Sequence, residues 1–274
     1  MSRNQQLARI LFALGMVSLG ILALVYSHLA LAWYSVPKWV PWRGGLTYAS
    51  GIILLSCGAG LLFKRTARLS ACILLPYLVI WLLMRVPALA TAPLTAVIWE
   101  NAGEIAVLVA GALVLFARLA ELREGSKLRF ATGANGMRTA RILFALSLLA
   151  FGVSHFAYVG QTAGLVPTWL PFRTGWAYLT GAAHLAAGIG VLFSVYPRLA
   201  ATMEAAMLSV FTLLVWVPAI LAAPTSMPTW TEILISLGVT AGAWVVAESI
   251  AAKDSTKSVR VTVDTPLGGR RRPS

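Results

Sequence analysis

The chain has 274 residues, of which 59% are hydrophobic and 11% are charged, and its net charge is +13. A soluble domain carries about 25% charged residues, so this composition excludes an ordinary soluble protein and indicates an integral membrane protein with the lipid bilayer as its main partner. In a soluble chain the basic excess would indicate nucleic-acid binding. Here its uneven distribution sets membrane orientation instead, and no nucleic-acid partner is expected.

Apolar runs of helical length predict eight transmembrane helices, because about 20 apolar residues cross the hydrocarbon core of a bilayer. The apolar residues are continuous rather than alternating, which favours helices over barrel strands. The first run starts after basic residues but is longer than the core of a signal peptide, so we expect it to be retained. The predicted spans lie near residues 8–33, 46–63, 69–91, 95–117, 141–160, 175–194, 199–222 and 230–249.

Two segments of the chain are related to each other. Residues 166–199 align without a gap with residues 36–69 and share fifteen identities in 34 columns. The match extends outward to ARILFAL at Ala8 and Ala140, and to LLMRVPALATAP (82–93) and LLVWVPAILAAP (213–224). An internal repeat of this kind predicts that one unit of about 130 residues was duplicated.

The repeat predicts four parts of the chain. They are a first four-helix unit at 1–120, a cytoplasmic linker at 121–138, a second four-helix unit at 139–250 and a disordered basic tail at 251–274. The tail lacks the apolar content that a folded segment needs.

The distribution of basic residues predicts the orientation. Of the 22 Lys and Arg residues, eighteen fall in the N-terminus, the even-numbered connections and the tail, three (Lys38, Arg43, Arg173) fall in the opposite connections, and Arg85 falls inside a span. The positive-inside rule therefore places both termini in the cytoplasm. Four spans per unit is an even number, so we expect an all-α polytopic protein of two parallel four-helix bundles in a bacterial inner (plasma) membrane.

The outer connections are rich in proline and tryptophan, as in VPKWVPW (36–42) and VPTWLP (166–171). Proline restricts its own φ and the residue before it, so these segments should form stiff caps at the headgroup level. The tryptophans are typical of an interfacial aromatic belt. Alternatively, Trp169 and Trp176 form the outer wall of a ligand pocket.

The repeated unit resembles the DoxX-like family of four-helix membrane proteins. The residues that carry the resemblance are GVSHF (152–156), VPTWLP (166–171), WAYLTGAAHLAAGIGVLF (176–193) and the Arg-Leu-Ala that begins at Arg198. The second unit matches better than the first. Many family members carry an acidic residue in their second helix, where this chain has His184 and Leu54.

Some members of that family are associated with thiosulfate oxidation feeding quinone, or with membrane oxidoreductase complexes. The resemblance therefore implies a four-helix fold for each unit, and it points to a quinone cofactor and to membrane or peripheral oxidoreductase subunits as partners.

Ionisable residues inside a span are costly unless paired, so they are candidates for function. Arg85, Glu100 and Glu104 are all expected in the outer third of the membrane. They could form an ion pair that ties a helical hairpin, or contact an anion or a quinone carbonyl. Glu204 and Glu248 are expected near the cytoplasmic ends of their spans, and we assign them no role.

His155 and His184 reach a similar depth in consecutive spans, counted at 1.5 Å per residue, and we expect them to face each other. They could be neutral and hydrogen-bonded to carbonyl groups, Tyr158 or Tyr178. They could also contact a quinone or carry protons. Haem ligation is disfavoured, because the first unit has Ala23 in place of the first histidine. In a pocket here, Trp169, Trp176 and Tyr178 would form the outer wall.

No motif of a soluble enzyme is present, and Cys57 and Cys72 have no metal-ligand spacing, so catalytic residues and metal ligands stay unassigned. The leading hypothesis is a quinone-associated membrane subunit or accessory of a redox system. The alternative is a non-enzymatic scaffold or assembly protein. Transport of a small solute has less support, because charged positions and helix breaks do not recur in both units.

Overall fold

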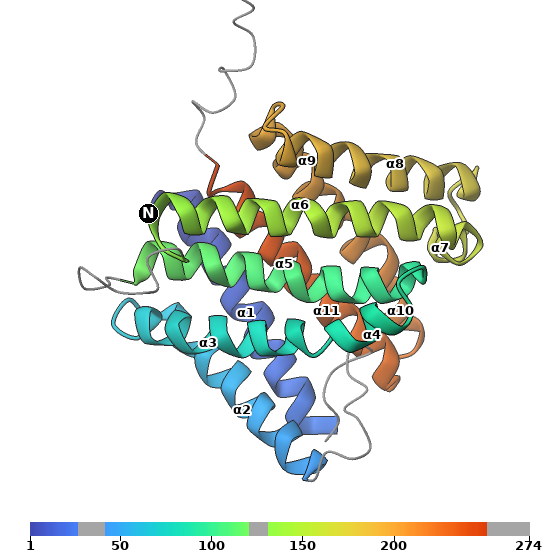
Figure 1. The fold of residues 1–274 in the computed structure, drawn as a ribbon. Helices are drawn as coiled ribbons and strands as arrows, with labels where there is room; N and C mark the ends of the chain where they lie inside the picture. Colours follow the sequence, from blue (N-terminus) through green and yellow to red (C-terminus); the bar gives the residue numbers. More distant parts are fainter. Residues whose placement is uncertain (27–41, 121–130, 251–274) are drawn as a thin grey trace, which may run out of the picture.

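The computed structural model describes residues 1–26, 42–120 and 131–250, and this part of the chain is helical with no β-strand. The first half, up to residue 120, contains α1 (Arg3–Tyr26), α2 (Arg43–Leu62), α3 (Ala67–Leu83), α4 (Val86–Thr91) and α5 (Ala96–Leu119) (Figure 1). The second half, from residue 131, contains α6 (Gly133–Ala157), α7 (Val159–Leu165), α8 (Arg173–Leu192), α9 (Pro197–Phe211), the π-helical turn η2 (Thr212–Trp216), α10 (Val217–Ala222) and α11 (Met227–Ala247).

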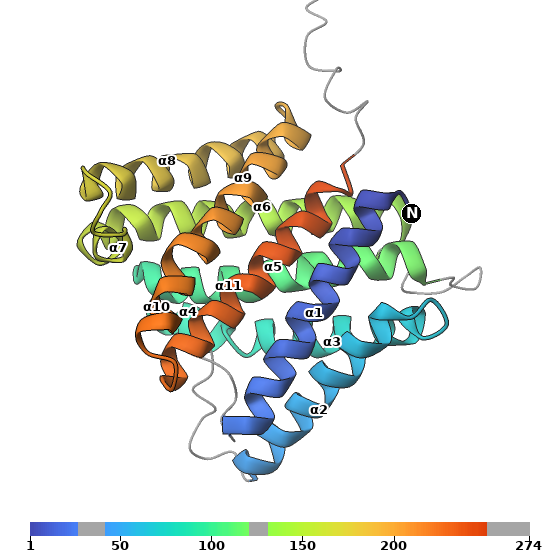
Figure 2. The same ribbon diagram turned by 180° about the vertical axis from the view of Figure 1, so that it is seen from behind.

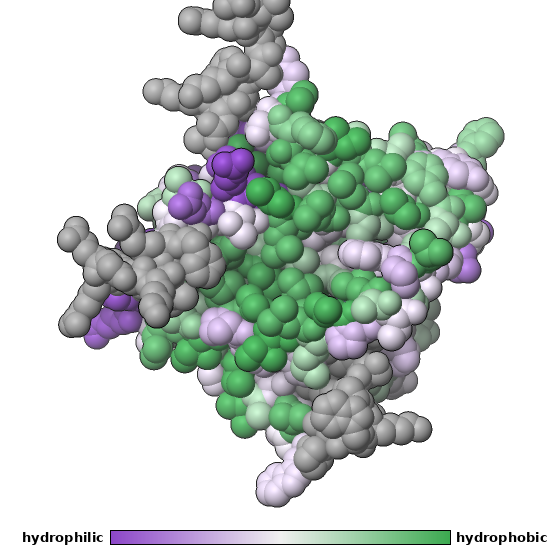
Figure 3. Space-filling model, viewed as in Figure 1, coloured by the Kyte–Doolittle hydropathy of each residue, from purple (hydrophilic) through white to green (hydrophobic). Residues whose placement is uncertain are grey.

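Seven stretches of the described residues are long and apolar enough to cross a membrane, which indicates an integral membrane protein. They are Arg3–Tyr26, Gly44–Leu62, Ala67–Thr91, Ala96–Leu119, Gly133–Ala157, Pro197–Ala222 and Met227–Ala247. Many large apolar side chains, such as Leu213 and Leu221, are exposed on the outside of the molecule. Apolar residues accordingly dominate the face shown in Figure 3, and hydrophilic residues gather at its margins.

One predicted boundary is wrong. The linker was expected to extend to residue 138, but α6 begins at Gly133. Thr132 is extended and Gly133 has φ of 55°, so the chain turns into the helix there, and Asn135 and Arg138 form its polar first turns. The rest of that linker (121–130), the first outer connection (27–41) and the tail (251–274) lie outside the described residues.

The long helices form a closed circuit. Each packs against the next long helix along the chain, from α1 to α2 and so on to α9 and α11, and α11 then packs against α1. In addition, α5 and α11 pack against each other. Figures 1 and 2 show the result from opposite sides, with α5 and α11 in the middle, α2 and α3 at one edge and α8 and α9 at the other.

The same glycine contact brings two helices together in each half. A Cβ atom added to Gly20 of α1 would lie 2.8 Å from the carbonyl oxygen of Gly51 in α2. One added to Gly152 of α6 would lie 2.8 Å from the carbonyl oxygen of Gly181 in α8. Both distances are shorter than a real Cβ contact, so only glycine permits these helices to approach so closely.

A pair of glycines also lies between the two central helices. A Cβ added to Gly111 of α5 would be 3.1 Å from the Cα of Gly242 in α11. These two residues occupy equivalent places in the aligned halves, since Trp99 and Trp230 at the starts of α5 and α11 have the same spacing. Two glycines at aligned positions of the sequence therefore lie side by side between α5 and α11.

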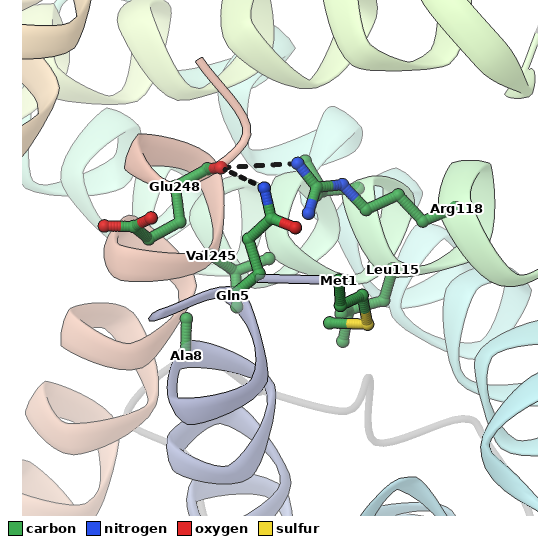
Figure 4. A pocket seen from close by; sticks show the side chains of 8 residues that line it. Met1, Gln5, Ala8, Leu115, Arg118, Val245 and Glu248 are labelled. Carbon is green, nitrogen blue, oxygen red and sulfur yellow. Dashed lines mark hydrogen bonds between the residues drawn. The ribbon is translucent and has the colours of Figure 1, made fainter. Parts of the chain in front are cut away.

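Side chains from three other helices hold the end of α11. Gln5 Nε2 and Arg118 Nη2 donate to the carbonyl oxygen of Glu248 at 3.1 and 3.3 Å, as Figure 4 shows beside a small pocket. Arg141 Nη2 donates to the carbonyl oxygen of Ser249 at 3.2 Å. The last carbonyl groups of a helix lack partners within the helix, and cations near them are favourable.

Candidate functional site

Among the described residues, the rings of Trp169, Trp176 and Tyr178 make no ring contact with the histidines, and the pocket wall stays a prediction. Trp169 is 70% exposed, and Trp176 uses its Nε1 to donate to the carbonyl oxygen of Pro171 at 3.0 Å. Tyr178 is exposed, and its ring contacts Phe156 at 5.8 Å between centroids. It precedes His184 by six residues, which is not a whole number of helical turns, so the two side chains leave α8 in different directions.

The two histidines are in contact. The rings of His155, near the end of α6, and His184, in the middle of α8, have centroids 4.8 Å apart at an angle of 62°. This agrees with the depth counted along the two predicted spans. His155 Nδ1 lies 2.9 Å from the carbonyl oxygen of Phe151, so this nitrogen carries the proton that the carbonyl accepts.

From the sequence we assign Glu204 no role, but in the structure it pairs with His184. Its Oε1 lies 2.8 Å from His184 Nδ1, and both side chains are buried. His184 comes eight residues before the end of α8 and Glu204 seven residues after the start of α9. Similar distances from a tight turn place two residues at a similar depth in a helical hairpin, and this count could have found the pair.

Aromatic rings surround the histidine pair. Phe211, the last residue of α9, stacks on His155 with centroids 6.4 Å apart and an angle of 12°. Phe211 also meets His184 at 6.3 Å, and Phe151 meets His184 edge-on at 5.7 Å. His155 and Phe211 are half-buried whereas His184 and Glu204 are buried, so the cluster has a more open and a more closed side.

Two carboxyl groups from the central helices lie near this cluster. Glu100 of α5 accepts a hydrogen bond from the hydroxyl of Ser154, the neighbour of His155 on α6. Glu100 is also within electrostatic range of His184 and of Glu232 on α11. Glu100 of the first half thus contributes a carboxyl group to the surroundings of the histidine cluster in the second half.

The predicted ion pair of Arg85 with Glu100 or Glu104 stays a prediction. Arg85 is the residue before α4, and both Arg85 and Glu104 take part in interactions within the protein. The hydrogen bond that the structure gives Glu100 goes to Ser154.

A one-residue insertion lies beside the cluster. Arg68 and Pro87 are 19 positions apart in the first half, whereas the aligned Arg198 and Pro218 are 20 apart. The π-helical turn η2 lies between them and begins directly after Phe211. Such turns arise where a helix absorbs an extra residue, and they occur frequently at functional sites.

Thr212, the first residue of η2, is buried and joins α9 to α11 through hydroxyl groups. Its Oγ1 donates to the carbonyl oxygen of Leu208 at 2.9 Å, and it lies 2.7 Å from Ser236 Oγ and 3.2 Å from Thr240 Oγ1. The extra residue therefore brings a polar side chain into contact with α11.

The first half has apolar residues at all three polar positions. Ala23, Leu54 and Leu74 align with His155, His184 and Glu204, and they are only 1%, 5% and 0% exposed. The cluster is therefore specific to the second half.

Comparison with known proteins gives one match. A family model described as a domain of unknown function (DUF8561) matches residues 144–248. No curated protein and no solved structure matches the chain. The matched segment contains His155, His184, Glu204 and Glu232.

The geometry limits what the cluster can hold. In the described part of the chain, no group of three or more His, Cys, Asp or Glu residues could hold a metal ion. Histidine rings with centroids 4.8 Å apart leave no room for a haem plane between them. The arrangement can instead donate and accept hydrogen bonds at imidazole nitrogens beside flat apolar surfaces, and it can take up protons.

Proposed function

We propose that this protein is a quinone-associated membrane subunit or accessory of a redox system. The observation that carries the proposal is the His155–His184 pair beside Phe211. Within the described residues each ring makes its hydrogen bond through Nδ1, which leaves Nε2 available to a ligand.

The chemistry of a quinone fits these residues. A quinone has a flat apolar ring, which suits the faces of Phe151 and Phe211, and carbonyl oxygens that need donors. A neutral imidazole whose Nδ1 carries the proton offers Nε2 as an acceptor, which suits the hydroxyl group of a quinol. The same imidazole, once protonated, donates from Nε2 to a quinone carbonyl. A bound quinone would supply two-electron redox chemistry, and the histidines would orient it and exchange its protons.

The proposed architecture is an eight-span protein of two DoxX-like units that arose by duplication, with α8 as the eighth span. Support comes from details that recur in both halves. α2 and α8 each have 20 residues, and each follows a residue in the left-handed conformation, Trp42 (φ 62°) and Phe172 (φ 57°). Trp99 and Trp230 donate to the carbonyl oxygens of Pro93 and Pro224, both at 2.8 Å.

The proposed location is the bacterial inner membrane with both termini in the cytoplasm. The start of α1, the end of α5, the start of α6 and the end of α11 lie at one side of the molecule in Figure 1, and α4, α7 and α10 lie at the other. The partners we propose are the lipid bilayer and membrane or peripheral oxidoreductase subunits.

Labelling tests the eighth span directly. Gln161 precedes α8 and Ser194 follows it, and both are exposed. Single cysteines at these positions, in a background with Cys57→Ala and Cys72→Ala, should react with an impermeant maleimide from opposite sides of the membrane. Reaction from the same side would refute the eight-span architecture.

Organic extraction of the purified protein tests the proposed ligand. Quinone should be found in the extract of the wild-type protein and lost in His155→Ala and in His184→Ala. Leu54→Ala is the matched control, because it makes a cavity at the equivalent place in the first half and should keep the quinone. Quinone retained in both histidine variants would refute the proposed site.

A scaffold role is the second candidate. Glu204 and His184 are buried and satisfy each other inside the helical hairpin, as in a pair that only stabilises packing. A wild-type protein that binds no quinone, yet still co-purifies with oxidoreductase subunits, would favour the scaffold.

A further inference from the structure

The ionisable side chains of α5 and α11 near the histidine pair lie toward one side of the membrane. Glu100 lies four residues after the start of α5 and Glu232 five residues after the start of α11. Both helices begin on the side opposite to the N-terminus in Figure 1. We infer that the buried His184–Glu204 pair exchanges protons with this outer side of the membrane through Glu232, Glu100, Ser154 and His155.

The path begins at half-buried groups and ends at the buried pair. Glu232 and Glu100 are half-buried, and Ser154 is buried and donates to Glu100. His155 is the next residue on α6, and its ring contacts His184. Where two neighbouring groups of the path are farther apart than a hydrogen bond, a water molecule can bridge them.

The other side of the pair is closed by apolar residues. Between the pair and the opposite ends of α6, α8 and α9, the hydroxyl of Ser147 is bonded within α6 to the carbonyl oxygen of Leu143. The other buried side chains there are apolar and include Phe144, Leu148, Ala187, Val191 and Ala201. Glu204 is about 10 Å from the start of α9, at 1.5 Å per residue. The short route to the cytoplasm is therefore apolar, and the longer route outward is polar.

Glu204 is placed to receive a proton. His184 Nδ1 donates to its Oε1, and its Oε2 is buried without a hydrogen-bond partner in the described structure. A proton that arrives at His184 Nε2 forms an imidazolium ion. The proton on Nδ1 then passes to Glu204, which leaves a neutral imidazole and a neutral carboxyl group. No electron moves in these steps, so they need no oxidant or reductant.

The groups that face this path come from five helices. They are Glu100 and, one turn further on, Glu104 of α5, His155 of α6, His184 of α8, Glu204 of α9 and Glu232 of α11. This inference deepens the proposed function, because it assigns the side from which a bound quinone would exchange protons, but its test needs no quinone.

Infrared spectroscopy of oriented proteoliposomes tests the inference. The pH on one side is changed while the other side stays strongly buffered, and the carboxyl C=O band that disappears in Glu204→Gln is followed. The band should respond to pH at the outer side, where a cysteine at Gln161 is labelled. A response to pH at the cytoplasmic side, or no response between pH 4 and pH 9, would overturn the inference.

Two variants that lose one hydroxyl group each provide the matched comparison. Ser154→Ala removes a hydroxyl on the path, and Ser236→Ala removes one that bonds Thr212 beside it. The response should be lost in Ser154→Ala and kept in Ser236→Ala, and equal behaviour would contradict the path.

Discussion

The two halves of the molecule have similar frames and different interiors. Glycine contacts between the first two helices, tryptophan–proline hydrogen bonds and proline-containing short helices recur at aligned positions. In the interior, Ala23, Leu54 and Leu74 of the first half align with two histidines and a glutamate in the second. The same frame is therefore present in the half that lacks the polar cluster.

The central helices extend this comparison. Each packs against both halves, since α11 contacts α1 and α9, and α5 contacts α3 and α6. Glu100 on α5 belongs to the first half in sequence but bonds Ser154 in the second. The first half therefore supplies the carboxyl group of Glu100 to the cluster of the second half. An isolated second unit would lack this carboxyl group.

The largest expected effect comes from breaking the buried pair. Glu204→Leu removes the acceptor of His184 Nδ1, and leaving that buried donor unsatisfied costs up to about 3 kcal/mol. The triple variant His155→Ala, His184→Leu, Glu204→Leu copies the interior of the first half and should recover most of this stability. Unfolding free energies in mixed detergent and SDS measure both effects.

The reverse change in the first half is the control. Leu74→Glu places a carboxyl group at the buried position that aligns with Glu204. The residue that aligns with His184 is Leu54, which cannot donate a hydrogen bond to this carboxyl group. The variant should therefore be as destabilising as Glu204→Leu. If the triple variant is less stable than Glu204→Leu alone, the halves do not have interchangeable interiors.

A smaller effect is expected where the halves agree. Gly20→Ala places a methyl group within 3 Å of three backbone atoms of α2, whereas Gly152→Ala places one within 3 Å of a single backbone atom, the carbonyl oxygen of Gly181, and of two side-chain atoms of Leu185. A backbone cannot rotate away as a side chain can. Gly20→Ala should therefore lose about 2–3 kcal/mol of stability and Gly152→Ala about 1 kcal/mol. The same unfolding assay measures both.

Gly164→Ala is the control for these two, because nothing lies within 4 Å of the added methyl group. Its stability should change by less than about 0.5 kcal/mol. Equal losses in Gly20→Ala and Gly152→Ala would contradict the expectation that contacts with backbone atoms tolerate an added methyl group less well than contacts with side-chain atoms.

The smallest effect is expected at the π-helical turn. Thr212→Val keeps the shape of the side chain but removes the contacts to Ser236 and Thr240. Hydrogen bonds between helices in a membrane contribute about 0.6 kcal/mol on average, so the melting temperature in detergent should fall slightly. A loss above about 2 kcal/mol would show that the turn depends on this hydroxyl group.

Much of the helical pattern could be predicted from the sequence, because apolar runs of membrane length leave little choice of structure. The depth of His155 and His184 followed from counting residues along straight helices. The distance of Glu204 from the end of its own span does not show that it pairs with His184. That pairing follows only when the positions of the two residues on either side of the turn are compared.

Other features depend on directions that a count of depth ignores. Tyr178 precedes His184 by six residues, so its side chain leaves α8 in a different direction, and its ring contacts Phe156. The pairing of α11 with α1 requires the two halves to be packed together, and no pattern within a single unit specifies it. The π-helical turn was visible only as one extra residue between two aligned landmarks.

The position of α11 bears on how this protein is made. α11 is at the centre of the molecule, and its end is held by Gln5, Arg118 and Arg141. Among the described helices it is the last to be synthesised, so α1 and α5 keep open faces in the membrane until residues 227–247 have been made. A nascent chain that stops before residue 227 therefore lacks this central helix, and membrane proteases that recognise unassembled helices should remove it. Only chains in which α11 has been made and docked should therefore persist.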